Sequence, residues 1–132
     1  MEIALTSAQR LYRDGVRTWL EDNMPSNWRD GATLEAMPED EERIFLTDWE
    51  RRLYAAGYSG IAWPTAYGGQ GRTMIEHYIA SYEMGRLAAP ESVNTIGREL
   101  VGPILLAVGT EEQKLRYIPA ILNVENIWCQ GF

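Results

Sequence analysis

Few residues of this chain are of the types that commonly carry out catalysis or bind metals. His77 is the only histidine and Cys129 the only cysteine among the 132 residues. A single cysteine excludes a disulfide or a thiolate metal site within the chain. A single histidine excludes a His-rich zinc site and disfavours a Ser-His-Asp triad. His77 lies within a helical pattern, where packing or surface exposure is the expected role, so we predict no catalytic residue and no metal site.

A glycine-rich segment and several pairs of opposite charge also stop short of a catalytic site. The segment YGGQG at residues 67–71 follows no predicted strand and lacks the Lys-Ser/Thr of a phosphate loop. It favours a turn in which glycines let two helices pack closely. Glu39 with Arg43, and Asp48 with Arg52, have the spacing of surface ion pairs on a helix, which contribute little. No arrangement supplies a base, a nucleophile and an oxyanion site together.

The chain is acidic, with a formal net charge of −7, and this charge argues against nucleic-acid binding. A nucleic-acid-binding protein presents a basic face to the phosphates, and no Lys/Arg cluster supplies one. The acidic run PEDEER at residues 38–43 predicts the solvated first turn of a helix. No apolar run reaches the roughly 18 residues of a membrane span, and no signal peptide precedes the first helix. A reducing, cytoplasmic location is the simplest expectation.

The pattern of apolar residues and caps predicts a helical protein. Hydrophobic residues make up 45% of the chain and aromatics 11%, enough for a core. Three segments, TSAQ (6–9), TMIE (73–76) and TEEQ (110–113), fit the capping box that begins a helix. Helices are predicted over residues 7–23, from 38 or 39 to about 56, from 73 to before 90, over 92–108, over 111–117 and after 119, with loops at 25–32 and 57–72.

Apolar side chains recur at helical spacing on the first three predicted helices, and these stripes predict the core. Gly57 is expected to end the second helix in the left-handed conformation, and Pro103 to kink or split the fourth. In the segment LNVEN (122–126), Asn123 is the residue whose type allows a left-handed conformation after the last helix. The predicted core positions are Leu5, Ala8, Tyr12, Val16, Trp19 and Leu20, then Phe45, Trp49, Leu53 and Ala56, then Ile75, Tyr78, Ile79 and Tyr82.

The last six residues, IWCQGF (127–132), differ from everything before them. Apolar and polar side chains alternate and are large, which is typical of a β-strand. The predicted fold class is therefore an all-α bundle of about five to six helices that ends in the first residues of a strand. Residues 1–126 are expected to form a helical domain, and 127–132 the start of a β-domain.

Three segments in order, GIAWPTAYGGQG (60–71), GPILLAVGTEEQKLRYIPAIL (102–122) and IWCQGF, resemble the acyl-CoA dehydrogenase family. The resemblance runs from about Leu5 to Phe132 and is to the N-terminal helical domain of that family. Its most specific elements are the loop with Pro64 and Tyr67-Gly68-Gly69 and the turn at residues 109–114. The resemblance implies that IWCQGF enters a middle β-domain, whose other strands lie beyond residue 132.

The resemblance implies an FAD-dependent enzyme that removes hydrogens from the α and β carbons of an acyl-CoA thioester to give a trans-2-enoyl-CoA. In this family a carboxylate base takes the α proton and the flavin accepts the β hydride. The base is a Glu of the C-terminal domain, and no residue here matches its motif, so the 132-residue chain alone is expected to be inactive. Electron-transfer flavoprotein or a similar acceptor, and a homo-oligomer or heterotetramer, are the implied partners.

The resemblance also implies site residues. Gln130 and Phe132 fall where the family's first middle-domain strand touches the flavin, and ordinary strand packing is the alternative. The helix from residue 92 resembles one that lines the acyl cavity, which makes Ser92, Thr95, Ile96 and Glu99 candidates for the cavity wall. The alternative is that Thr95 and Ile96 belong to the core and that Glu99 is solvated. Two glycines of this helix, at positions 97 and 102, would leave room for a bulky acyl group.

Two other function classes remain open at this point. In the first, the chain is a complete, non-catalytic helical subunit that docks an aromatic-rich face on a partner. Some members of the family are built from two different chains, so the resemblance allows such a subunit. A helical DNA-binding regulator is disfavoured by the net charge of −7. The subunit and the N-terminal-domain hypotheses share the same fold and differ in what lies beyond residue 132.

Overall fold

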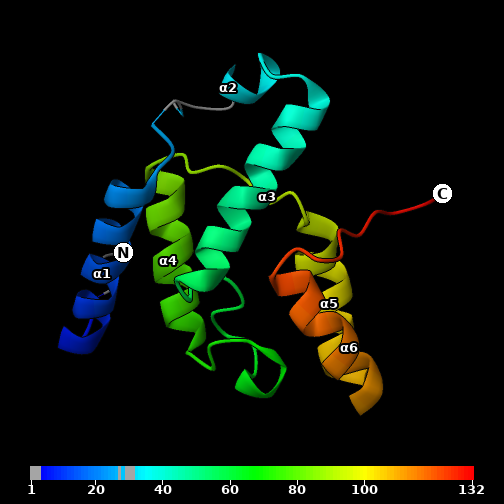
Figure 1. Ribbon diagram of the computed structural model, residues 1–132. Coiled ribbons are helices and arrows are strands. Elements are labelled where there is room, and N and C mark those ends of the chain that lie inside the picture. The colour runs from blue at the N-terminus through cyan, green and yellow to red at the C-terminus, as the bar shows by residue number, and fades with distance from the viewer. Residues whose placement is uncertain (1–3, 27, 29–31) are drawn as a thin grey trace.

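The computed structural model describes residues 4–26, 28 and 32–132, and within them the protein is helical (Figure 1). The all-α class is confirmed, because the described residues form six α-helices and no strand. None of these helices is long and apolar enough to cross a membrane. The elements are α1 (Ser7–Asn23), α2 (Ala32–Glu35), α3 (Glu39–Ala55), a 3₁₀ turn η1 (Thr65–Tyr67), α4 (Met74–Arg86), a π-helical segment η2 (Gly97–Val101), α5 (Gly102–Val108) and α6 (Glu111–Leu122).

The main core lies between α1, α3 and α4. Figure 1 shows these three helices on one side of the molecule and the pair α5–α6 on the other. Trp49 and Leu53 of α3 pack on Val16 and Leu20 of α1, and the segment after α3 adds Ile61. The predicted core positions Val16, Leu20, Trp49 and Leu53 are thus confirmed, and Tyr12 and Trp19 are partly buried against them. The prediction is wrong for Ala8, which is exposed.

All three predicted capping boxes form, and this is why the helix starts could be placed correctly. In each box a Thr hydroxyl accepts the backbone N–H three residues on, and the side chain of that residue accepts the Thr N–H. The two groups so paired would otherwise be unsatisfied at the helix end. The boxes are Thr6 with Gln9, Thr73 with Glu76 and Thr110 with Gln113.

The predicted core stripe of α4 is wrong at three of its four positions. Ile79 is buried, but Ile75, Tyr78 and Tyr82 are 49%, 65% and 69% exposed. The buried stripe of α4 runs instead through Ile79, Ala80 and Glu83. The carboxylate of Glu83 is buried in the core, whereas the neighbouring Tyr82, which the pattern placed there, is exposed.

Several helix boundaries differ from the prediction. α6 is one helix through Pro119, not two. Proline removes one hydrogen bond of the helix, but Ile118 and the residues after Pro119 are buried, so packing holds the helix together. The short α2 was not predicted, and of the predicted loop 25–32 that precedes it, positions 27 and 29–31 lie outside the described residues. The fourth predicted helix is not split at Pro103, because η2 continues directly into α5 with helical backbone at Val101 and Gly102. It also begins later than residue 92, since residues 92–94 are not helical.

Left-handed backbone follows α3, η1, α4 and α6, at Gly57, Gly68, Ala88 and Val124. Gly57 has φ +81° after α3, as predicted. Asn123 does not adopt the left-handed conformation, since its φ is −91°, and the next residue, Val124, adopts it with φ +61°. A β-branched residue rarely adopts this conformation, but Val124 is buried, and its packing offsets the strain.

The loop between α3 and α4 brings the two most specific sequence segments together. The Tyr67 hydroxyl donates to Oε2 of Glu111 at 2.7 Å, which joins η1 to the start of α6. The loop also folds on itself, since the N–H of Gln70 donates to the carbonyl of Gly60. Gly69 is required there, because a Cβ would lie 2.2 Å from the carbonyl oxygen of Trp63. The loop therefore forms a fixed bridge between the two groups of helices.

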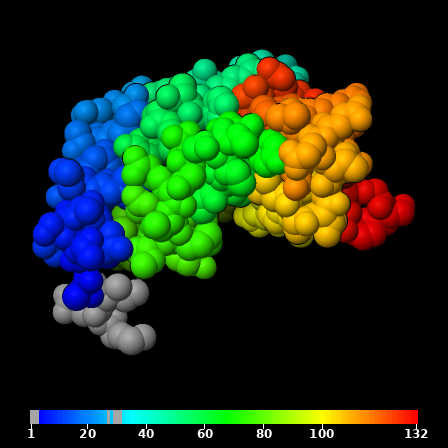
Figure 2. All heavy atoms as spheres, turned by 90° about the horizontal axis from the view of Figure 1, so that it is seen from below, coloured from blue at the N-terminus to red at the C-terminus, as the bar shows by residue number. Residues whose placement is uncertain are grey.

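Residues 127–132 extend from the rest of the protein, at the red end of the chain in Figures 1 and 2. They adopt no regular secondary structure, and the part of the chain that the structure describes has no strand with which they could pair. A strand needs such a partner for its backbone groups. The strand and the division at residue 126 stay predictions.

Candidate functional site

A cavity of about 530 Å³, called here the larger cavity, lies where the segment after α3, the helix α4 and residues 92–103 come together. Its volume falls within the roughly 300–1,000 Å³ that is usual for ligand pockets. Ile61, Trp63, Met74 and Pro103 supply apolar surface to it. The cavity therefore combines an apolar lining with the polar groups described below.

Two of the four predicted substrate-contact residues line the larger cavity. Ser92 and Glu99 are in its lining, whereas Thr95 and Ile96 are not. Thr95 is exposed, and its hydroxyl donates to the carbonyl of Ser92 at 3.0 Å. Ile96 is half-buried. A contact between any of the four and a substrate stays a prediction.

Ser92 and Arg98 meet on a buried carboxylate. Glu50 of α3 is 2% exposed. Its Oε1 accepts a hydrogen bond from Nη1 of Arg98 at 2.9 Å and another from the Ser92 hydroxyl. Its Oε2 has no hydrogen-bond partner in the described part of the chain. Burial of a carboxylate is costly unless a positive group compensates it, so charge as well as hydrogen bonding holds Arg98 in place.

Arg98 also acts on the one histidine. His77 is half-buried and lines the larger cavity. Burial lowers the pKa of His77, and the nearby positive charge of Arg98 lowers that pKa further. The neutral imidazole is therefore favoured at neutral pH. It presents one donor and one acceptor at the cavity.

The space beside the two glycines of this region is filled by protein, so the expectation that it admits a bulky acyl group is wrong. A Cβ on Gly102 would lie 2.1 Å from Cη2 of Trp63. A Cβ on Gly97 would lie 2.4 Å from Oδ1 of Asn94. The glycines allow the backbone to approach these side chains closely, and Trp63 reaches the cavity because Gly102 leaves it space.

The two predicted flavin contacts, Gln130 and Phe132, lie on the exposed end of the chain. Asn94 fixes the beginning of that end, because its Nδ2 donates to the carbonyl of Asn126 and its Oδ1 accepts the N–H of Trp128, both at 2.9 Å. Beyond this point the side chains are exposed and line neither of the cavities described here. The residues present do not by themselves form a flavin site, and the flavin contacts stay a prediction.

The residues around the larger cavity can bind and orient a ligand, but they do not assemble a reaction centre. In residues 4–26, 28 and 32–132, no group of three or more His, Cys, Asp or Glu side chains is placed to hold a metal ion. The cavity wall contains polar groups, among them His77, Ser92 and Arg98. Glu50 is already paired with Arg98. The geometry is that of a binding wall.

Sequence reasoning missed Glu50, Arg98 and His77 as members of this site. One signal for Glu50 was present, because Leu46, Glu50 and Leu53 have the spacing of one buried helix face. A charged residue on such a face needs a partner from elsewhere. The partner, Arg98, is 48 residues away in the sequence, and no local pattern identifies it.

Comparison with known proteins places these observations in a family. A sequence profile described as the N-terminal domain of acyl-CoA dehydrogenases matches residues 6–125. Acyl-CoA dehydrogenase IpdE1 of Mycolicibacterium smegmatis is 40% identical over 126 residues, which cover 92% of this chain and 31% of that protein. The chain spans about a third of the length of the curated relatives it matches.

Solved structures show the same fold. The structure described as the Tcur3481-Tcur3483 steroid ACAD aligns with a TM-score of 0.74 and 29% identity, over 96% of this chain and 32% of that one. The ChsE4-ChsE5 complex from Mycobacterium tuberculosis aligns with a TM-score of 0.65 and 28% identity, over 93% of this chain and 29% of that one. Both are similar to this chain over nearly its whole length.

Proposed function

The chain belongs to the acyl-CoA dehydrogenase family, as its N-terminal domain, and from this premise we propose that it forms part of the acyl-pocket wall of an FAD-dependent enzyme. The complete enzyme takes a proton from the α carbon and a hydride from the β carbon of an acyl-CoA, and releases a trans-2-enoyl-CoA. FAD, when bound, supplies the hydride acceptor. The base and most of the flavin site belong to parts of the enzyme outside these 132 residues.

The single observation that carries this proposal is the larger cavity. It is lined by Ile61, Trp63 and Met74, apolar side chains suited to an acyl group. It also includes Ser92 and Glu99, two of the residues that the family resemblance assigned to the pocket wall. This chain's part in the reaction is to bind the acyl group and exclude water from it, which holds the α and β carbons in place for the rest of the enzyme.

The test uses the complete enzyme and a matched pair of variants. Wild type is expected to show a flavin absorption spectrum and to oxidise acyl-CoA substrates with an artificial electron acceptor. Met74→Ala is expected to raise KM severalfold, because Met74 lines the larger cavity. Leu115→Ala is the control, because Leu115 is similarly exposed but lies outside that lining. Equal KM values for both variants would refute the wall assignment.

The 132-residue chain alone provides a second test. It is expected to give no turnover of any acyl-CoA when FAD is added, because the described residues assemble no base and no flavin site. Measurable turnover by the purified chain would overturn the proposed division of roles. Electron-transfer flavoprotein or a similar protein is the proposed acceptor for the complete enzyme.

A second candidate function is a helical subunit of a heteromeric acyl-CoA dehydrogenase-like complex. The observation that favours it is that two of the similar structures are described by pairs of chains, Tcur3481-Tcur3483 and ChsE4-ChsE5. The first of these is described as a steroid ACAD, which supports a bulky acyl group as the substrate. Native mass spectrometry of the purified assembly distinguishes one kind of chain, as in a homo-oligomer, from two.

A further inference from the structure

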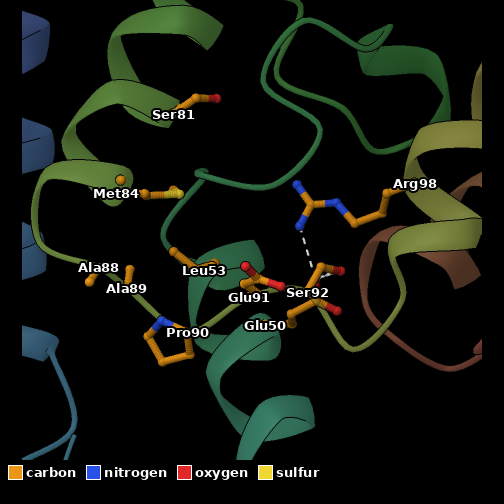
Figure 3. Close-up of a pocket in the computed structure, with 11 residues that line it drawn as sticks. Glu50, Leu53, Ser81, Met84, Ala88, Ala89, Pro90, Glu91, Ser92 and Arg98 are labelled. Carbon is orange, nitrogen blue, oxygen red and sulfur yellow. Dashed lines mark hydrogen bonds and ion pairs between the residues drawn. The ribbon is translucent and has the colours of Figure 1, made fainter. Parts of the chain in front are cut away.

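A second cavity, of about 420 Å³ and called here the smaller cavity, lies next to the larger one. Figure 3 shows it between α3, α4 and the segment that leads into residue 92. Leu53, Met84, Ala89 and Pro90 give it an apolar lining. It therefore offers the same kind of surface as the larger cavity and has no assigned role.

The two cavities share a boundary. Three side chains, Ser81, Ser92 and Arg98, line both of them. Two of the three are small, and Arg98 is the long one. In Figure 3 the Arg98 side chain reaches from the right of the view toward Glu50 and Ser92, with Ser81 and Met84 on the opposite side. The Arg98 side chain is thus the bulkiest part of the boundary.

Arg98 is fixed in this position by groups from other elements. Glu50 of α3 accepts its hydrogen bond at 2.9 Å and is itself buried. The Ser92 hydroxyl donates to the same carboxylate oxygen and accepts the N–H of Asn94 at 3.0 Å. His77 of α4 is close enough for its pKa to be lowered by Arg98. An apolar group that displaced Arg98 would leave Glu50 buried without its cation, which is strongly unfavourable.

We propose that Arg98, held by Glu50, is the partition that separates the two cavities and limits the size of the acyl group that the enzyme accepts. This inference rests on the proposed function of the larger cavity as part of the acyl pocket. Without the Arg98 side chain, the larger cavity continues into the smaller one. The smaller cavity, lined by Leu53 and Met84, then takes the far end of a longer or bulkier acyl group.

The experiment compares two double variants of the complete enzyme, Glu50→Gln/Arg98→Ala and Glu50→Gln/Arg98→Met. Both remove the same two charges, so neither leaves a buried carboxylate without a cation. The Gln side chain can still accept the Ser92 hydrogen bond. The two variants differ only in the length of the side chain at position 98, and methionine fills the space of the arginine stem.

The readout is kcat/KM for straight-chain acyl-CoA thioesters from butyryl to palmitoyl and for the CoA thioester of a steroid carboxylic acid. The preference is kcat/KM for the largest substrate divided by kcat/KM for butyryl-CoA. We expect this preference to be about tenfold or more higher in the variant with alanine at position 98 than in the variant with methionine, because a few methylenes in an apolar pocket have effects of this size. A ratio of two kcat/KM values is independent of how much of each preparation is folded. A preference that differs less than about threefold between the variants overturns the proposal.

Crystal structures of the two variants give a second readout that needs no turnover. One continuous cavity is expected with alanine at position 98 and two separate cavities with methionine. Two separate cavities in both variants overturn the partition. If wild type oxidises none of these thioesters, the proposed function fails, whereas the crystal structures still decide whether residue 98 separates the cavities.

Discussion

Two carboxylates are buried in the part of the chain that the structure describes, and their surroundings differ. Glu83 of α4 is fully buried, and both of its oxygens are occupied. Arg17 donates to Oε2 from Nε and to Oε1 from Nη2, both at 2.9 Å. Arg86 donates to Oε2 at 2.9 Å. Two cations and three hydrogen bonds therefore compensate one negative charge, and the cluster ties α1 to α4.

Glu50 of α3 is equally inaccessible but less completely paired. One cation, Arg98, and one hydroxyl, Ser92, share Oε1, and Oε2 has no hydrogen-bond partner in the described part of the chain. Buried polar groups are normally satisfied, so an unsatisfied one needs an explanation. Glu83 is buried between α1 and α4, whereas Glu50 lines the smaller cavity. The difference separates an ion pair that holds two helices together from one that stands beside a cavity.

The largest expected effect comes from removal of the single cation at Glu50. Arg98→Ala is expected to lower the free energy of unfolding of the chain by about 3–5 kcal/mol, because it leaves a buried carboxylate without a cation. Urea unfolding followed by tryptophan fluorescence measures the change. Arg51→Ala, at an exposed position in the same helix as Glu50, is the control and is expected to change little. Equal stabilities for the two variants would show that Glu50 does not depend on Arg98.

The next largest expected change in stability comes from a glycine-to-alanine substitution on the Glu50 side of the molecule. Gly102→Ala is expected to cost roughly 3 kcal/mol, the upper end for an overpacked site, because the new Cβ meets the ring of Trp63 at 2.1 Å. Gly15→Ala in α1, on the Glu83 side, has nothing within 4 Å of the new Cβ and is expected to stabilise the protein by about 0.5–1 kcal/mol. Thermal unfolding of both variants checks the opposite signs, and a loss of stability in Gly15→Ala would contradict the contrast.

Substitution of one arginine at Glu83 is expected to have a smaller effect than at Glu50. Arg17→Ala leaves Arg86 paired with the carboxylate, so the loss of unfolding free energy is expected to be less than half of that for Arg98→Ala. The double variant Arg17→Ala/Arg86→Ala leaves Glu83 without a cation and is expected to lose more than the sum of the two single variants. Strict additivity in urea unfolding would show that the two arginines act independently.

The same contrast explains which parts of the protein could be predicted from the sequence. The ends of α1, the three capping boxes and the stop at Gly57 follow from residues close together in the chain. The exposure of Tyr78 could not be predicted in this way. The pattern treats an aromatic at helical spacing as core, but the core position went to a carboxylate paired with Arg17, 66 residues away.

The site shows a similar limit. Family resemblance pointed to Ser92 and Glu99, which line the larger cavity, and also to Thr95 and Ile96, which do not. It could not find Arg98, because the role of Arg98 depends on a carboxylate from a different helix. Long-range charge pairs depend on how helices pack. A sequence pattern can indicate that one charged residue is buried, but it cannot identify the distant residue that pairs with it.

The smallest expected effect concerns the pH dependence of the Glu83 cluster. Burial raises the pKa of Glu83, but hydrogen bonds and charges from Arg17 and Arg86 outweigh it, and the net result is a pKa below the ordinary value of a glutamate. A carboxylate whose pKa is lower in the folded than in the unfolded state contributes stability above its unfolded pKa of about 4.3. That contribution is lost as the pH falls through the folded pKa.

The variant Glu83→Gln isolates this contribution, because glutamine does not titrate. The difference in unfolding free energy between wild type and Glu83→Gln is expected to be constant from pH 7 to about 5 and to shrink below about pH 4. Urea unfolding at a series of pH values measures it, and Glu35→Gln, at an exposed position in α2, is the control with a small difference throughout. A difference that grows in acid would mean that Arg17 and Arg86 do not stabilise the ionised carboxylate. Glu83 would then be held by packing alone, and the distinction between the two buried carboxylates would have to rest on the smaller cavity beside Glu50.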